Sequence, residues 1–173
     1  MEKVVRTPID ERDVEKLKIR DIVYIDGIII TARDMTHRLI IEKLRKGELD
    51  PKMFEGGVIY HAGPVVKREG QEWKIISIGP TTSLRMDKYI PQLLELVKVR
   101  LIVGKGGLGP RSEEAVKKHK CIYGIFPGGC GIVAAQKVKR VIDVLYLEEL
   151  GIPEAMWILE VEKFGPIVIT VAP

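Results

Sequence analysis

The stretch Leu101-Ile102-Val103-Gly104-Lys105-Gly106-Gly107 decides the class of fold. Its three apolar residues are typical of a buried strand, and the glycines that follow predict a tight turn. A helix is expected next, over about residues 112–118. A strand that leads through a glycine turn into a helix is the repeating unit of an α/β protein.

The same order of elements extends to both sides of this stretch. A helix is predicted over about residues 34–45, with Asp34 able to cap it and Gly47 at its end. Another is predicted from 82 to about 98, where Pro91 should cause a kink or a division into two pieces, because an interior proline removes a hydrogen bond. The further strands expected are residues 58–60, 73–78, 122–125, 138–147, 155–161 and 167–171.

The N-terminal part of the chain predicts a hairpin. Residues 22–25 and 28–31 are apolar runs, and the Asp26-Gly27 dipeptide between them supplies the positive φ angles of a type I′ turn. Residues 1–18 are polar and are expected to form an arm or an edge strand.

Composition and charge narrow the class of protein. The 173 residues are expected to form a single domain, with residues 1–15 as an arm or edge segment and 16–173 as its body. The net charge of +4 is spread along the chain, which suits a small anion better than a nucleic acid.

No apolar run approaches the roughly 20 residues of a membrane span. The N-terminus has no signal-peptide core, so the expected location is the cytoplasm, away from membranes.

The segment Gly79-Pro80-Thr81-Thr82-Ser83-Leu84-Arg85 is the first candidate for binding an anion. Unpaired N–H groups at a helix N-terminus attract carboxylates and phosphates, and one of Thr81 and Thr82 can cap the helix while the other faces a cleft. Arg85 returns to the same face one turn later, where its guanidinium can hold a carboxylate through two hydrogen bonds. The alternative is an ordinary capped helix with a surface arginine, and spacing alone weighs the two about equally.

Two further junctions carry cations. Lys105 lies on a glycine turn that lacks the Ser or Thr of a Walker loop and the acid of a dinucleotide fold, so the glycines alone are explained as well by a tight turn. Arg33 lies where a strand meets a helix, with Asp34 able to orient it and His37 on the first helical turn. A lone histidine is more often structural than catalytic, and an isolated surface Arg–Asp pair contributes little stability.

Together these features resemble a known family, the β subunit or C-terminal domain of class I fumarases and L-tartrate dehydratases. The chain carries, in the family's order, Ala32-Arg33-Asp34 with His37, Gly63-Pro64-Val65, residues 79–87, Gly104-Lys105-Gly106 and residues 150–157. The resemblance runs from about residue 15 to the end, and the combined pattern is specific although no single motif is. It implies a swivelling three-layer β/β/α domain with mixed sheets rather than a Rossmann sheet. The chain departs from the family at Gly107, where a relative has asparagine.

The resemblance also implies a partner and a cofactor. In this family the other half holds a [4Fe–4S] cluster through three cysteines, with one iron open to substrate. This chain has two cysteines, Cys121 and Cys130, so the cluster is expected on a separate α subunit. The chain alone is then expected to fold but to be inactive, and either an α2β2 assembly or a homodimer of this chain is compatible with that expectation.

Residue roles follow from the same resemblance. Thr81 would be the base at C3 of a dicarboxylate, and Thr82, Arg85, Arg33 and Lys105 would hold its carboxylates. The leading expectation is the reversible hydration of fumarate to malate. The alternatives are an L-tartrate dehydratase β subunit and, in another class, a non-catalytic swivelling domain that binds an anion or regulates a partner. A nucleotide-binding protein is a distant third.

Overall fold

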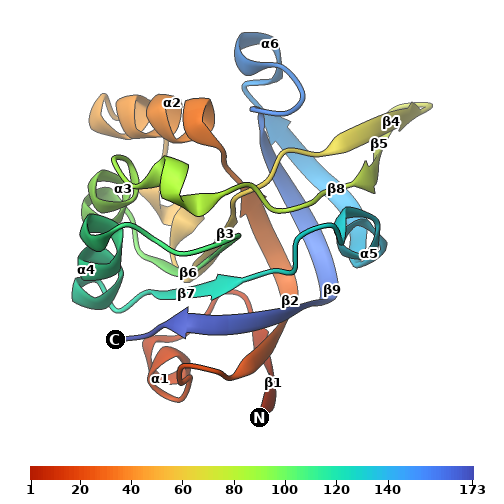
Figure 1. Ribbon diagram of the computed structural model, residues 1–173. Coiled ribbons are helices and arrows are strands. Elements are labelled where there is room, and N and C mark those ends of the chain that lie inside the picture. Colours follow the sequence, from red (N-terminus) through yellow and green to blue (C-terminus); the bar gives the residue numbers. More distant parts are fainter.

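The computed structural model describes residues 1–173 and is built around one mixed sheet of seven strands (Figure 1). The first five strands in the order across the sheet are parallel to one another, and β9 is antiparallel to its neighbours. That order is β1 (Glu2–Arg6), β2 (Ile22–Thr31), β3 (Gly57–Tyr60), β6 (Val99–Gly104), β7 (Ile122–Ile125), β9 (Met156–Val171) and β8 (Val138–Leu145).

The long strand β9 closes this sheet into a ring. It pairs with β2 from Val168 opposite Ile22 to Ile158 opposite Ile30. Its other edge pairs with β8 over residues 156–161 and with β7 near its end, over residues 168–171. Because β2 is also joined to β7 through β3 and β6, these five strands form a closed ring. A Rossmann sheet, in contrast, is open and has two free edges.

The parallel strands send alternate side chains into two separate cores. Ile59 and Ile102 pack under the helices, whereas Val58 and Leu101 point into the ring together with Phe164 of β9. Figure 1 shows the covering helices on one side of the sheet: α2 (Asp34–Arg45), α3 (Ile90–Leu96) and α4 (Pro110–Lys118). The layers are therefore helices, parallel strands and antiparallel strands, and the expected β/β/α arrangement is confirmed.

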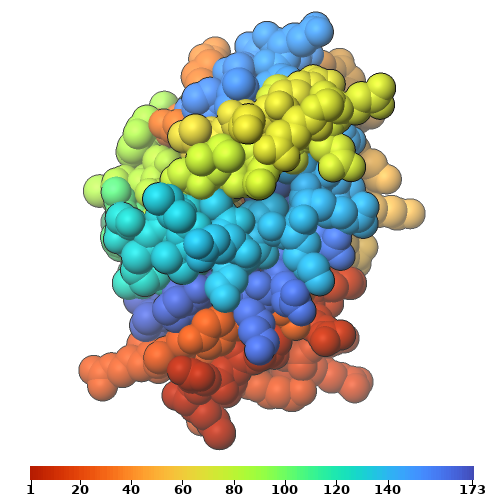
Figure 2. All heavy atoms as spheres, turned by 90° about the vertical axis from the view of Figure 1, so that its right-hand side faces the viewer, coloured from red at the N-terminus to blue at the C-terminus, as the bar shows by residue number.

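The remaining elements are short. Strands β4 (Val65–Glu69) and β5 (Glu72–Ser77) form a hairpin that extends from the body (Figure 1), and Trp73 packs edge-on against Trp157 with ring centroids 5.5 Å apart. Figure 2 shows this hairpin directly above α5 (Gly131–Gln136). The short helices α1 (Glu11–Glu15) and α6 (Leu147–Leu150) and the 3₁₀ turns at Pro51–Phe54 and Ser83–Met86 complete the chain. None of the helices is long and apolar enough to cross a membrane.

Most predicted elements lie close to their expected bounds. Helix α2 has its predicted extent and ends before Gly47, whose φ is +70°. Asp34 is not its cap, because Arg33 holds that position and donates its N–H to the Thr36 hydroxyl, 2.9 Å away. The predicted helix from 82 to 98 is divided into a 3₁₀ turn and α3, with Pro91 in the first turn of α3, where the missing N–H is tolerated.

The hairpin predicted at Asp26-Gly27 is wrong, because β2 runs without a turn through both residues. Gly27 does have a positive φ, +111°, but it forms a bulge in the pairing with β9, where the register shifts between Ile25 and Gly27. The Ile28 N–H donates instead to the Thr7 hydroxyl, 2.6 Å away. The prediction of a positive φ at Gly27 is confirmed, but the residue forms a β-bulge rather than a turn.

The two separate strands expected at 155–161 and 167–171 are also one strand in the structure. Its sequence contains Gly165-Pro166, a dipeptide that usually ends a strand, and Lys163 has a φ of +48° within it. The strand continues because β2 pairs with it on both sides of that point.

Replacement of Gly27 by alanine should lower the free energy of unfolding by about 3 kcal/mol, since it combines an unfavourable φ with a steric clash. A Cβ at Gly27 would lie 2.3 Å from the Thr7 hydroxyl oxygen. Gly70→Ala is the matched control, because Gly70 has a φ of +65° with nothing within 4 Å, and it should cost only about 1 kcal/mol. Urea denaturation measures both, and equal losses would contradict the bulge.

Candidate active site

The carboxyl ends of three parallel strands bring the predicted cations to one edge of the sheet. Thr31, the last residue of β2, lies opposite Tyr60, the last residue of β3, which in turn lies opposite Val103 of β6. Arg33 follows β2 by two residues, and Lys105 follows β6 directly. Two junctions that are distant in the sequence therefore meet at the edge of the sheet where α/β proteins commonly bind ligands.

The segment that follows β5 crosses this edge and brings the two threonines to it. The Thr81 N–H donates to the carbonyl of His61, directly after β3, at 2.6 Å. The Ser83 N–H donates to the carbonyl of Lys105 at 3.0 Å, and Thr82 forms a β-bridge with Lys105. Thr81 is half-buried and Thr82 is exposed, and neither hydroxyl makes a hydrogen bond within the chain.

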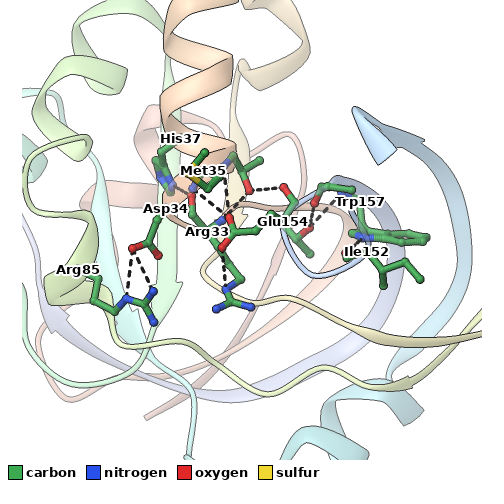
Figure 3. A network of polar contacts seen from close by, with 11 residues as sticks. Arg33, Asp34, Met35, His37, Arg85, Ile152, Glu154 and Trp157 are labelled. Atoms are coloured by element: carbon green, nitrogen blue, oxygen red, sulfur yellow. Dashed lines mark hydrogen bonds and ion pairs between the residues drawn. The ribbon is translucent and has the colours of Figure 1, made fainter. Parts of the chain in front are cut away.

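Arg85, the third predicted cation, forms an ion pair with Asp34 (Figure 3). Its Nε and Nη2 atoms lie 3.2 and 3.1 Å from the same carboxylate oxygen, Oδ2. Asp34 is the first residue of α2 and is adjacent to Arg33. Figure 3 shows the guanidinium groups of Arg33 and Arg85 on the same side of the polar network.

Glu154 belongs to this network, although the sequence alone assigned it no role. Its Oε1 lies 3.5 Å from Arg33 Nε, and its Oε2 accepts hydrogen bonds from the N–H groups of Met35 and Thr36 at 3.0 and 3.4 Å. The N–H groups at the start of α2 are therefore occupied by a carboxylate of the chain itself. Glu154 did lie within the family-like residues 150–157, but spacing could not place it beside a residue 121 positions away.

Lys105 differs from the two arginines because it makes neither an ion pair nor a side-chain hydrogen bond. Its side chain is exposed and passes over the glycine turn after β7, where a Cβ at Gly128 would lie 3.4 Å from Lys105 Cδ. Its charge is thus available to a ligand without the loss of an internal partner.

The helix cap predicted at Thr81 or Thr82 is not found. After Thr82 the chain forms only the four-residue 3₁₀ turn, and the Thr82 side chain makes no capping hydrogen bond. After Lys105 the glycine turn leads to α4 at Pro110, close to the predicted start of that helix. Arg85 accordingly does not lie one helical turn above Thr82, and it contacts Asp34 of α2. The side chains of these junctions, rather than helix N-termini, face the edge of the sheet.

Two buried histidines, His37 and His61, contact the residues at this edge of the sheet. The Nδ1 atom of His37 lies 2.7 Å from the Arg33 carbonyl and must donate to it, and Nδ1 of His61 lies 2.8 Å from the Ser83 hydroxyl. Both side chains are fully buried, and their rings meet edge-to-face with centroids 5.2 Å apart. A Cβ at Gly104 would lie 1.7 Å from the Ser83 hydroxyl oxygen, so only glycine permits this packing.

Burial keeps both imidazoles neutral at pH 7. It lowers the pKa of His37 to about 4 and the pKa of His61 well below its usual value. The Nε2 atom of each ring is buried without a hydrogen-bond partner. The two histidines therefore fix the geometry of the edge, and His61, to which the sequence assigned no chemistry, lies beneath the threonine segment.

The cysteines of this chain do not form a metal-binding set. Both are free thiols. Cys121 is fully buried, which raises its thiol pKa to about 12, and Cys130 is half-buried at the start of α5. No group of three or more histidine, cysteine, aspartate or glutamate side chains is placed to hold a metal ion. The residues present therefore do not fit the role of cluster ligands.

Comparison with known proteins identifies close relatives along nearly the whole chain. The family model described as Fumarase C-terminus matches residues 2–172. The L(+)-tartrate dehydratase subunit beta of Escherichia coli K12 is 40% identical over 171 residues, which are 99% of this chain and 83% of that protein. The putative L(+)-tartrate dehydratase subunit beta of Methanocaldococcus jannaschii is 45% identical over 159 residues, which are 92% of this chain and 82% of that protein.

A longer relative has a different name. The putative fumarate hydratase class I of Geobacillus stearothermophilus is 37% identical over 165 residues, which are 95% of this chain but only 31% of that protein. The same unit therefore occurs both as a separate subunit and as part of a longer chain.

Acidification from pH 7 to pH 5 should lower the free energy of unfolding by about 2 kcal/mol through His37 alone. The pKa of His37 is about 4 in the folded chain against 6.5 for a free histidine, so the unfolded chain binds the proton first. The stabilisation is present above pH 6.5 and is lost as the pH falls toward 4. Urea denaturation at pH 7, 6 and 5 measures the loss, and a smaller loss is expected for His37→Asn. A drop of the same size in that variant would contradict the assignment.

Proposed function

Because the chain belongs to the Fumarase C-terminus family, we propose that it is the β subunit of a two-subunit iron–sulfur hydro-lyase that reversibly hydrates fumarate to malate. The names of its relatives, a dehydratase and a hydratase, support the hydro-lyase class. The observation that carries the proposal is that Arg33, Arg85 and Lys105 lie at the edge of the sheet to which the segment with Thr81 and Thr82 is bound through His61 and Lys105. Such a set suits a dianionic substrate whose charge increases during the reaction.

The two arginines would hold carboxylates in different ways. Arg33 uses only Nε in its contact with Glu154, so both terminal nitrogens are available as a fork for a carboxylate. Arg85 uses Nε and Nη2 for Asp34, so one terminal nitrogen is left without an internal partner. Arg33 would therefore bind a carboxylate through two hydrogen bonds and Arg85 through one, and Lys105 would add a point charge.

Thr81 would act as the base that removes the proton beside a carboxylate. A threonine hydroxyl is a very weak base, so it could serve only as an alkoxide stabilised by nearby cations. Its backbone N–H is fixed to the His61 carbonyl at 2.6 Å, and its hydroxyl has no partner within the chain. Removal of the proton places extra negative charge on the carboxylate, and the same cations would stabilise that charge.

The iron–sulfur cluster would belong to an α subunit, because the two cysteines of this chain do not fit it. When bound there, it would supply a Lewis acid for the hydroxyl that enters or leaves. Residues 1–173 would contribute one domain to a cytoplasmic enzyme, either as α2β2 or around a homodimer of this chain, and would be inactive alone. Two relatives that carry the name subunit beta support the need for a partner.

A second candidate is the β subunit of an L(+)-tartrate dehydratase. Two of the relatives bear that name, and one of them is 45% identical to this chain. Tartrate carries hydroxyl groups in addition to its two carboxylates, and the cations on this edge would hold the carboxylates of either substrate.

Reconstitution with a cluster-bearing partner should give anaerobic hydration of fumarate, whereas this chain alone should show none. Parallel assays with fumarate, malate and L(+)-tartrate decide between the two candidates. A reconstituted complex that acts on no dicarboxylate would refute the enzyme and favour a non-catalytic anion-binding domain. Turnover by the chain alone, without iron, would refute the need for a partner.

Arg33→Lys should reduce kcat/KM about 30-fold, because lysine cannot reproduce a two-nitrogen fork. Arg85→Lys should reduce it less, by about 5-fold, because Arg85 has only one terminal nitrogen to lose. Arg38→Lys is the matched control on the same helix as Asp34, since Arg38 is exposed and makes no ion pair. Steady-state kinetics of the reconstituted complex give the ratios, and the reverse order of effects would contradict the division of roles.

A further inference from the structure

We propose that Glu154 is a positioning residue, which fixes the guanidinium of Arg33 so that its two terminal nitrogens face the substrate. This proposal rests on the proposed function and deepens it, since it assigns a role to a residue outside the expected substrate-binding set. Figure 3 shows Glu154 at the centre of the network, between the start of α2 and the side chain of Arg33.

The two carboxylate oxygens of Glu154 make different contacts. Oε2 accepts from the N–H groups of Met35 and Thr36 at 3.0 and 3.4 Å, which fixes the carboxylate to the first turn of α2. Oε1 then lies 3.5 Å from Nε of Arg33, a distance that suits an ion pair better than a hydrogen bond. The position of the carboxylate is thus set by the helix, and the arginine adjusts to it.

The loop that carries Glu154 is itself fixed to the body. The carbonyl of Glu154 accepts from the Thr36 hydroxyl at 2.6 Å, and the Trp157 indole N–H donates to the Ile152 carbonyl at 2.8 Å. Trp157 is fully buried. A flexible surface acid would have no means to hold another side chain, whereas this one is anchored on both sides.

The stem of Arg33 is confined as well. A Cβ at Gly63 would lie 2.9 Å from Arg33 Cδ and 2.3 Å from the carbonyl oxygen of Pro153, so the stem passes close to a backbone that only glycine can supply. The side chains of Arg33 and Glu154 are 25% and 18% exposed, less than in most ion pairs of this chain. Nε is buried without a hydrogen bond and faces only the Glu154 carboxylate, so the confined stem and this ion pair leave the terminal nitrogens for a ligand.

Positioning and simple neutralisation predict opposite effects. If Glu154 only offset the charge of Arg33, its replacement by glutamine would strengthen the attraction for a dianion and lower KM. If Glu154 positions Arg33, the same replacement frees the guanidinium, and binding becomes weaker because the ordering must then occur during binding. Glutamine keeps an oxygen for the N–H groups of α2, so the fold is expected to survive.

The kinetic test uses Glu154→Gln in the reconstituted complex, with Glu149→Gln as a control at an exposed position of the preceding helix. The expected result is a rise in KM of about 10-fold for the E154Q variant and none for the control. A double-mutant cycle with Arg33→Gln should show that the E154Q effect disappears once Arg33 is absent. A lower or unchanged KM, or full additivity with Arg33→Gln, would overturn the proposal.

A second measurement does not depend on activity. In the isolated full chain, the ¹⁵N–¹H signal of Arg33 Nε, assigned by its loss in Arg33→Lys, should move or broaden in E154Q and stay in place in E149Q. An unmoved signal would overturn the proposal even if the enzyme is active. Conversely, a wild-type complex that turns over no dicarboxylate would refute the proposed function, while a moved signal would still establish the contact between Glu154 and Arg33.

Discussion

The antiparallel pairing of β2 with β9 is the constraint on which the rest of the structure depends. It joins residues as distant as Ile22 and Val168 and closes the strands into a ring, which separates the core under the helices from the core within. The same pairing places the start of β9 beside the end of β2, where the backbone N–H of Trp157 donates to the Thr31 hydroxyl at 3.0 Å. The loop with Glu154 precedes that contact, so the same pairing brings Glu154 beside the start of α2.

The sequence predicted local elements well and their partners poorly. Helix α2 and the division at Pro91 follow from periodicity and from the missing proline N–H, which are local causes. Asp26-Gly27 misled the prediction because a positive φ serves a bulge as readily as a turn, and only the presence of β9 on the neighbouring edge decides between them. The same distant pairing continues β9 past Gly165-Pro166, a dipeptide that usually ends a strand.

The residues of the candidate site divide in the same way into those that local sequence predicts and those that only tertiary packing brings in. Arg33 and Lys105 could be expected together, because both follow strands that run parallel and end at one edge. Glu154 and His61 could not be found in this way, since Glu154 meets Arg33 across a long sequence separation and His61 acts from a buried position through Ser83. Chemistry at strand ends is readable from a sequence, whereas the groups that hold it in place depend on tertiary packing.

The glycines at this edge differ in how much room they leave for evolutionary change. Gly63 and Gly104 have backbone or side-chain atoms where any Cβ would lie, so neither site can acquire a side chain without displacing Arg33 or Ser83. Gly107 has no atom within 4 Å of such a Cβ, and its φ is not in the left-handed region. A side chain can therefore be introduced at position 107 without displacing any neighbouring group, whereas a change at Gly63 or Gly104 requires a second change nearby.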